Sequence, residues 1–230
     1  MIERAADGWL KPIHLMTVLL LAAAMVTATV TFTGATPAKA ATTPSAPAYA
    51  TAAPAALAAA GATGLQANVN KKGAVSWALA NWKGGYNGFG DDCTDFVSRA
   101  LAYGGGDPEK LDPNGGSTSN DHYWYFLTAK YIRWWSHSWS VAEDLAVHLN
   151  LIGSYWLKYW NNAKPGDIIF ANWSGNKFSG ISHVGIITQM SHGVPMITQH
   201  SPRQKNISLS YWLKHGGRDV HVWIASPNAG

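Results

Sequence analysis

Hydrophobic residues recur at helical spacing in two segments on either side of a glycine-rich stretch. In the segment NKKGAVSWALANW, residues 70–82, apolar side chains fall three or four positions apart, which predicts a helix. Residues 104–121 are mostly Gly, Pro, Asn, Ser and Asp, a composition that predicts an exposed loop. A second helix is expected from Asp92 to Gly104, because one apolar stripe runs through it, formed by Phe96, Val97, Ala100 and Leu101.

The third predicted helix rests on a capping signal. Ser140 followed by Glu143 has the spacing of a capping box, in which each side chain satisfies a backbone N–H at the start of the helix. We therefore expect this helix to begin at Val141 and to run to about Leu151.

The hydrophobic pattern changes to the strand type in the C-terminal part of the chain. KPGDIIFANW predicts a turn into a buried strand at residues 167–172. SHVGIITQMSHGVPMITQHS predicts two strands joined by a turn near residues 191–193, and DVHVWIAS alternates as a last strand. Helices followed by an antiparallel sheet define an α+β domain.

The N-terminal part has the layout of a secretory signal. A basic start is followed by the apolar run LMTVLLLAAAMVTATV and then by TPAKA, so residues 1–40 are expected to be a signal peptide cleaved after Ala40. An uncleaved anchor is the alternative, because the run is about as long as a membrane helix needs to be. Residues 41–65 are rich in Ala, Pro and Thr and carry no charge, which predicts a disordered linker. Residues 66–230 then form one domain.

Composition narrows the classes of partner. The chain has 17 Lys and Arg against 13 Asp and Glu, a net charge of +4. These charges are spread without Lys/Arg runs, so we expect no nucleic-acid partner. The 12 tryptophans fit either a large core or a groove for an extended ligand. We also expect a monomer without stable membrane insertion after signal cleavage.

Cys93 is the only cysteine of a chain that we expect to be exported. Asp92 before it is a good N-cap residue, so the thiol should lie in the first turn of the second helix. The positive end of the helix dipole would stabilise a thiolate there and lower the thiol pKa. A thiolate is a nucleophile, and the alternative is a small buried hydrophobic residue.

A reactive cysteine needs a base, and nine histidines are available. His183 is the preferred candidate, because it opens a predicted strand and Gly185 leaves room on the same face. The alternative is a structural histidine. The other histidines fall in the signal, in loops and turns, on a helix, in the WWSHSW segment, or in strands with less suitable surroundings.

The third catalytic residue depends on the register of the predicted hairpin. In one register His200 stands directly opposite His183, with Cβ atoms ~5 Å apart. In the register one residue away, Gln199 stands opposite Gly185 and is the diagonal neighbour of His183. We favour His200, because a histidine can accept as well as donate a hydrogen bond, and keep Gln199 as the alternative.

Neither a metal nor a cofactor is expected. Zinc would require three or four His, Cys or acidic ligands at short spacing, and the sequence has no H-E-x-x-H or C-x-x-C. The glycine-rich GGYNGFG lacks the Lys-Ser/Thr ending of a phosphate-binding loop.

Four blocks carry a family resemblance. DDCTDFVSRALAYGG, RWWSHSWSVAEDLAVHL, KPGDIIF and SHVGIITQ…ITQHS resemble, in this order, the putative amidase domain of secreted Gram-positive proteins. That domain is similar to the NlpC/P60 and CHAP cysteine peptidase–amidase superfamily. The resemblance implies a papain-like α+β core with the cysteine helix packed on an antiparallel sheet. It implies Cys93 as nucleophile, His183 as base, and a polar third residue at His200 or Gln199.

The resemblance also draws attention to residues around this set. Asp95 stands where many relatives have Asn, and it would either raise the thiol pKa or bind a substrate amine. Tyr86 corresponds loosely to an upstream tyrosine of the superfamily. Trp134, Trp135 and Trp139 are candidates for a substrate groove, with core packing as the alternative.

These observations lead to one functional expectation and two rivals. We expect a secreted or cell-wall-associated, cysteine-dependent hydrolase that cleaves an amide bond in peptidoglycan peptides or in their link to the glycan. The rivals are a non-catalytic wall-binding module of the same fold and a thiol acyltransferase.

Overall fold

The computed structural model describes residues 69–85, 89–113, 118–129, 132–217 and 219–228. The predicted signal peptide and linker, at 1–40 and 41–65, lie outside the described residues, as does Tyr86. Within the part that is described, no helix has both the length and the apolar character needed to cross a membrane.

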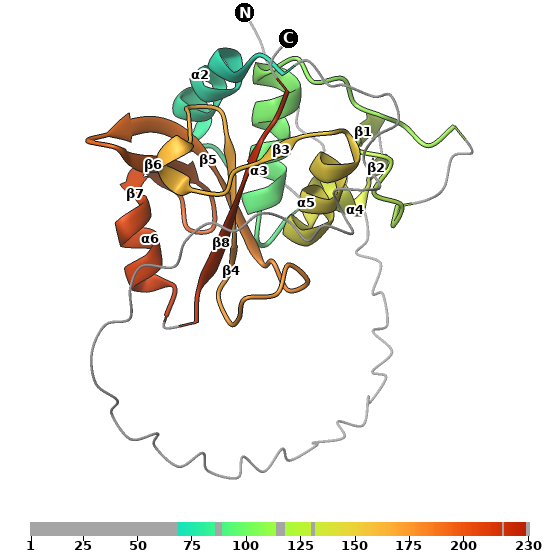
Figure 1. The fold of residues 1–230 in the computed structure, drawn as a ribbon. Helices are drawn as coiled ribbons and strands as arrows, with labels where there is room; N and C mark the ends of the chain where they lie inside the picture. The colour runs from blue at the N-terminus through green and yellow to red at the C-terminus, as the bar shows by residue number, and fades with distance from the viewer. Residues whose placement is uncertain (1–68, 86–88, 114–117, 130–131, 218, 229–230) are drawn as a thin grey trace, which may run out of the picture. The chain divides into compact units, whose positions relative to one another are not determined.

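The first two predicted helices are confirmed. Asn70 caps the first of them, since its Oδ1 accepts a hydrogen bond from the Gly73 N–H at 3.0 Å. The second helix continues without a break into a π-helical segment (Figure 1). The helical elements are α2 (Lys71–Asn81), α3 (Cys93–Arg99), the π-helix η1 (Ala100–Gly104), α4 (His137–Ser140), α5 (Ala142–Leu151), the 3₁₀ helix η2 (Trp160–Asn162) and α6 (Leu209–His215).

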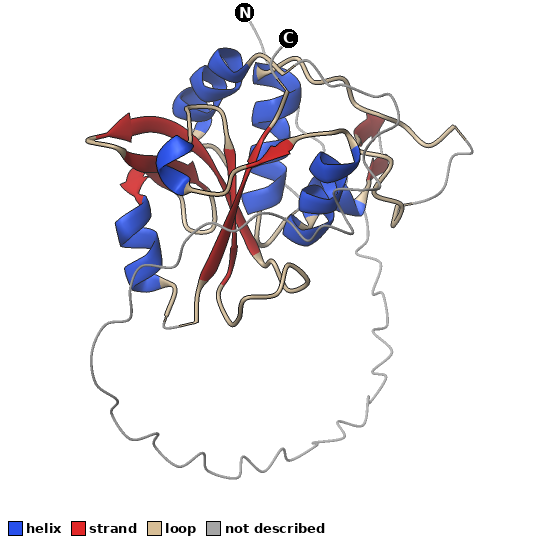
Figure 2. Ribbon diagram, in the orientation of Figure 1, coloured by secondary structure: helices blue, strands red, loops and turns tan. Residues whose placement is uncertain are grey.

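The strands form a six-stranded antiparallel sheet and a separate hairpin (Figure 2). The order in the large sheet is β3-β8-β4-β5-β6-β7, with the strands β3 (Tyr155–Trp156), β4 (Ile168–Asn172), β5 (His183–Ser191), β6 (Val194–Gln199), β7 (Gln204–Ser208) and β8 (His221–Ser226). The hairpin pairs β1 (Phe126–Ala129) with β2 (Ile132–Trp135). The α+β prediction is confirmed, while β1, β2, β3, β7, α4, α6 and η2 were not predicted.

The capping box at the start of α5 does not form, although the helix itself does. The hydroxyl of Ser140 donates to the Ser136 carbonyl, and the carboxylate of Glu143 accepts the backbone N–H of Gly180 at 2.8 Å. Val141 occupies the N-cap position without a side-chain hydrogen bond. A local contact with the preceding turn therefore takes the Ser140 side chain, and a tertiary contact takes that of Glu143.

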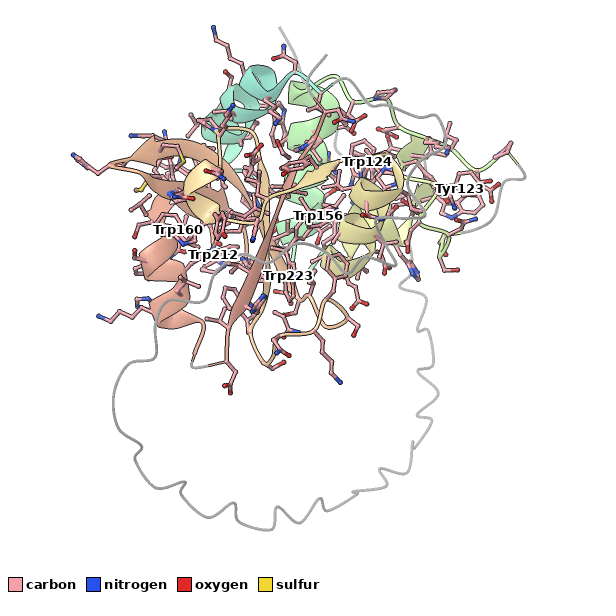
Figure 3. All side chains as sticks on the ribbon, viewed as in Figure 1. Tyr123, Trp124, Trp156, Trp160, Trp212 and Trp223 are labelled. Atoms are coloured by element: carbon pink, nitrogen blue, oxygen red, sulfur yellow. The ribbon has the colours of Figure 1, made fainter. Side chains whose placement is uncertain are left out.

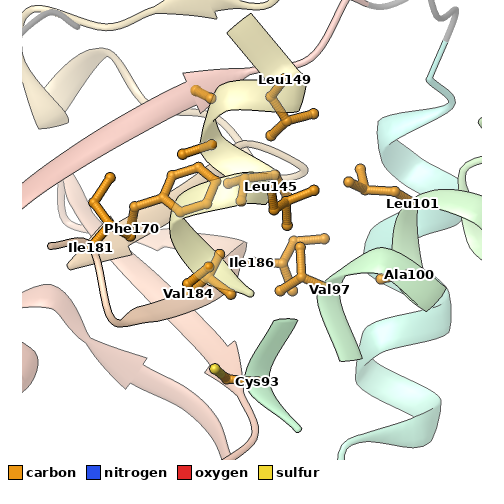
Figure 4. Close-up of a cluster of buried hydrophobic side chains, with 14 of the residues drawn as sticks. Cys93, Val97, Ala100, Leu101, Leu145, Leu149, Phe170, Ile181, Val184 and Ile186 are labelled. Carbon is orange, nitrogen blue, oxygen red and sulfur yellow. The ribbon is translucent and has the colours of Figure 1, made fainter. Parts of the chain in front are cut away.

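Both faces of the large sheet are buried, which explains why all five residues of β4 are inaccessible to solvent. One face packs against α2, α3 and α5 through Phe170, Val184 and Ile186 (Figure 4). The other face, with Ile169 and Ile187, packs against α6 and the segment before β4. Figure 3 labels two tryptophans of this second side, Trp160 and Trp212.

Two further contacts fix α2 in place. A Cβ on Gly73 would lie 2.2 Å from the Gly104 carbonyl oxygen, so the close approach of α2 to η1 requires glycine. Lys71 donates to Asp167 at 2.9 Å and to Ser226 at 2.6 Å, which ties the start of α2 to β4 and β8.

Candidate active site

Cys93 is the first residue of α3 and lies at one end of the hydrophobic cluster between α3 and the sheet (Figure 4). Its side chain is 6% exposed. The sulfur lies 3.7 Å from the Thr94 hydroxyl and accepts a hydrogen bond from the backbone N–H of Val184 on β5. Because Val184 follows His183 directly, the packing of α3 on β5 brings the thiol to the strand position next to the predicted base.

Burial raises the pKa of the Cys93 thiol above its ordinary value. Hydrogen bonds from Thr94 and from the Val184 N–H oppose this shift, and the negative charge of Asp91 adds to it. The expectation that the helix N-terminus lowers the thiol pKa is therefore wrong for this structure. The physical reason is that the loss of water around the sulfur outweighs the polar groups that face it.

His183, the first residue of β5, is buried between two tryptophans. Its ring centroid lies 5.5 Å from that of Trp173 and 5.4 Å from that of Trp212. Burial lowers the pKa of the imidazole, while a hydrogen bond to Gln199 and the charge of Asp91 raise it; the net shift is downward. A raised thiol pKa and a lowered imidazole pKa both favour the neutral forms of the two groups.

Gln199 is the hydrogen-bond partner of His183, with 3.0 Å between Gln199 Oε1 and His183 Nε2. The same Oε1 accepts the indole N–H of Trp212, and the Nε2 of Gln199 donates to the Pro202 carbonyl at 3.3 Å and to Gln204 Oε1 at 3.0 Å. An indole N–H can only donate, so the atom that it contacts must be the amide oxygen. This oxygen then accepts from His183 as well, which places the proton on Nε2 and leaves the lone pair on Nδ1.

The favoured hairpin register, with His200 opposite His183, is wrong. Ile186 pairs with Thr198, so Gln199 and not His200 lies on the His183 face. The physical reason is a register shift around Thr188, whose hydroxyl bonds the Thr198 hydroxyl at 2.8 Å. This irregularity moves the pairing by one residue between the turn and the site.

His200 lies on the opposite face and belongs to a separate polar cluster. Its ring stacks on Phe96 at 4.2 Å between centroids, and its Nδ1 lies 2.8 Å from Asp92 Oδ2. The other carboxylate oxygen of Asp92 accepts the Ser201 hydroxyl at 3.0 Å, and the Asp92 N–H donates back to that hydroxyl oxygen at 3.0 Å. Asp92 is thus at the N-cap position, but its side chain binds the β6–β7 turn instead of the helix.

Gly185 also differs from its expected role. A Cβ at this position would lie 2.7 Å from Ile197 Cγ2 and 3.5 Å from Gln199 Cβ. The space beside Gly185 is therefore filled by β6 and allows Gln199 to approach, so it does not admit a substrate.

Asp95 is part of the core and not of a substrate surface. Its side chain is fully buried, with Oδ1 accepting the Trp139 indole N–H at 2.6 Å and Oδ2 accepting the Arg99 Nε–H at 2.8 Å. Asp91, not Asp95, is the acid that raises the thiol pKa. Both expected roles of Asp95 are thus corrected, because the i, i+4 pair with Arg99 turns its carboxylate away from the thiol.

The tryptophan candidates separate into two groups. Trp139 is fully buried and packs in the core, as the alternative interpretation held. Trp134 is 40% exposed, and with Trp135 it lines a cavity of about 240 Å³ beside the β1–β2 hairpin. Trp135 also packs against Phe89, with 4.8 Å between the ring centroids.

Two larger cavities lie on either side of the turn after β6. One, of about 360 Å³, borders the His183 side and is lined by Trp173, His183, Gln199, Ser201, Pro202, Gln204, Tyr211, Trp212, His215 and Gly216. The other, of about 390 Å³, borders Asp92 and is lined by Phe89, Gly90, Asp92, Ser201, Pro202 and Arg203. His183 thus lines the first cavity, and Asp92, the residue before Cys93, lines the second.

The described residues contain no group of three or more His, Cys, Asp or Glu side chains that could hold a metal ion.

Trp212 was missed by the sequence analysis. It lies on α6, a short helix capped by Ser208, whose hydroxyl accepts the Tyr211 N–H at 3.1 Å. A Ser followed by LSYWLKH is a usable start signal, but nothing local shows that the indole N–H reaches the amide of Gln199.

Comparison with known proteins identifies the family of the chain. The family described as "Putative amidase domain" matches residues 68–224, so the chain belongs to this amidase-like family. The chain is also 26% identical over 159 residues to "Uncharacterized protein YhbB" of Bacillus subtilis (strain 168). That match covers 66% of this chain and 46% of the relative, so the chain spans about half the relative's length. No solved structure matches significantly.

Proposed function

We propose that this protein is a cysteine-dependent amide hydrolase in which Cys93 is the nucleophile and His183 is the base. The observation that carries the proposal is the amide oxygen of Gln199, which accepts from both Trp212 and His183. This contact supports a fixed tautomer of His183, in which Nδ1 is free to accept a proton. The next residue, Val184, contacts the Cys93 sulfur through its backbone N–H.

The reaction starts from a neutral thiol and a neutral imidazole. His183 Nδ1 takes the thiol proton as the Cys93 sulfur attacks the substrate carbonyl, and the Cys93 backbone N–H at the start of α3 stabilises the oxyanion. The His183 imidazolium, held by Gln199, then protonates the leaving amine. Water hydrolyses the thioester, and the thiol and the imidazole return to their neutral forms.

We further propose that the substrate is a peptidoglycan peptide and that the protein acts outside the cell. The resemblance to the cysteine peptidase–amidase superfamily and the signal-like N-terminus support this choice. The cavities lined by His183 and by Asp92, of about 360 and 390 Å³, and the cavity of about 240 Å³ beside the β1–β2 hairpin support an extended substrate.

The test compares variants of the purified protein on defined muropeptides, with products identified by mass spectrometry. Cys93→Ser and His183→Ala should each lower kcat/KM by at least about a hundredfold, since each removes a group that takes part in bond cleavage. His122→Ala, at an exposed histidine, is the matched control and should retain full activity.

Three outcomes would overturn the proposal. Full activity of Cys93→Ser excludes the thiol mechanism. Wall binding without cleavage by any variant identifies a binding module. New cross-links in place of free amine identify an acyltransferase.

A further inference from the structure

The two cavities beside the candidate catalytic pair differ in charge. The cavity on the His183 side is lined by aromatic and neutral polar residues and by two imidazoles, without Lys, Arg, Asp or Glu. The cavity on the Asp92 side is lined by one carboxylate, that of Asp92, and by one guanidinium, that of Arg203, which is exposed to solvent. A substrate that fills both cavities therefore meets a positive charge on one side only.

Hydrogen bonds connect the turn that carries Arg203 to Asp92, the residue before the nucleophile. Ser201 exchanges two hydrogen bonds with Asp92, each of 3.0 Å, and its backbone φ is 54°. The neighbouring His200 adds a contact of 2.8 Å to the same carboxylate. These bonds hold the turn at a fixed position relative to Cys93, so the cavity keeps its shape around the guanidinium.

The guanidinium is available for a ligand. The carboxylate oxygens of Asp92 accept from His200 and Ser201, and among the described residues no carboxylate forms an ion pair with Arg203. A Cβ on Gly85 would lie 3.0 Å from Arg203 Nη2, so the glycine leaves space for the guanidinium. An arginine fork binds a carboxylate through two parallel hydrogen bonds.

We propose that Arg203 binds a free carboxylate on the acyl part of the substrate and selects peptides that carry one. This inference rests on the proposed function. The acyl side is assigned because the cavity borders Asp92, the neighbour of the residue that retains the acyl group. The neutral cavity borders His183, which protonates the leaving amine, and so lies on the amine side.

The test uses two forms of one stem peptide, with the α-carboxyl group of its D-glutamate either free or converted to an amide. The unmodified protein should cleave the free-acid form with a kcat/KM about ten- to a hundredfold higher, the range expected for a charge-assisted pair. Arg203→Gln should remove this preference by slowing cleavage of the acid form alone, and Arg203→Glu should invert it.

Lys205→Gln is the matched control, since it removes one positive charge from β7 at an exposed residue outside the cavity lining. It should keep the preference. Equal loss on both peptides in Arg203→Gln, or equal effects of Arg203→Gln and Lys205→Gln, overturns the inference.

Calorimetric titration of the same two peptides into Cys93→Ala protein separates this inference from the proposed function. If Cys93→Ala protein binds the acid form more tightly than the amide form, and the double variant with Arg203→Gln binds both equally, the carboxylate site is supported. This result holds even if no Cys93-dependent cleavage is found. Equal binding of both peptides to Cys93→Ala overturns the site even if cleavage is confirmed.

Discussion

Replacing Asp95 by Asn should destabilise the fold without acting through the substrate. The carboxylate is fully buried, while its partner Arg99 is 15% exposed. Asn can still accept the Trp139 indole N–H through its oxygen, which replaces Asp95 Oδ1 at 2.6 Å. Its NH₂ group, however, would face the Arg99 Nε–H that now lies 2.8 Å from Oδ2, donor against donor.

The magnitude follows from these contacts. Removing one partner of a buried pair costs about 3–5 kcal/mol, and the residual exposure of Arg99 places Asp95→Asn near ~3 kcal/mol. For a domain of this size that corresponds to a fall in Tm of about 6–12 °C. Asp95→Ala should cost roughly 1–3 kcal/mol more, because it also leaves the Trp139 N–H without an acceptor.

Urea unfolding followed by tryptophan fluorescence measures this loss, with Asp219→Asn as a control at an exposed carboxylate. The control should change the free energy of unfolding by less than about 0.5 kcal/mol. Arg99→Gln and the double variant complete a cycle, in which the double variant should lose less than the sum of the two single losses. A raised KM with unchanged stability in Asp95→Asn would refute the reasoning and return Asp95 to the substrate site.

Three further predictions concern Asp107, Asp91 and Trp212. Burial raises the pKa of Asp107 to about 7, so its proton binds the folded state more tightly and stability falls as pH rises from about 4 to 7. Asp107→Asn should therefore raise the free energy of unfolding, measured in urea, by up to about 4 kcal/mol at pH 8 and by little at pH 4. An equal rise at both pH values would contradict this cause. Asp91→Asn should lower the pKa of both nucleophile and base, so both limbs of the kcat/KM–pH profile should move to lower pH; opposite shifts would refute it. Trp212→Phe should lower kcat about tenfold with little change in KM, because Gln199 loses the donor that fixes its amide; a change in KM alone would instead indicate a substrate contact.

The elements with clear periodicity could be predicted from the sequence. The helical spacing in α2 and α3, and the apolar runs of β4, β5, β6 and β8, correspond to side chains that are buried in the two core clusters. Strand β7, with the sequence QKNIS, is an edge strand with partly exposed residues. It therefore lacks the apolar run or the apolar/polar alternation from which a strand is predicted.

The site was only partly predictable, for two physical reasons. The register between β5 and β6 depends on an irregularity at Thr188, and a shift of one residue decides whether Gln199 or His200 shares a face with His183. The pKa of Cys93 depends on how much water the fold removes from its sulfur, a tertiary property that N-cap chemistry alone does not show.

The two ends of the described domain meet. The Val69 N–H donates to the Asn228 carbonyl at 2.8 Å, and Asn228 Nδ2 donates to the Gly153 carbonyl at 3.1 Å. The ends of the described domain therefore lie side by side, and a short Gly/Ser linker between them would suit a circular permutant. New ends could open at Gly193, in an exposed turn where a Cβ would meet nothing within 4 Å. In that permutant, β4 and β7 would still flank β5 and β6 after the connection between them is cut.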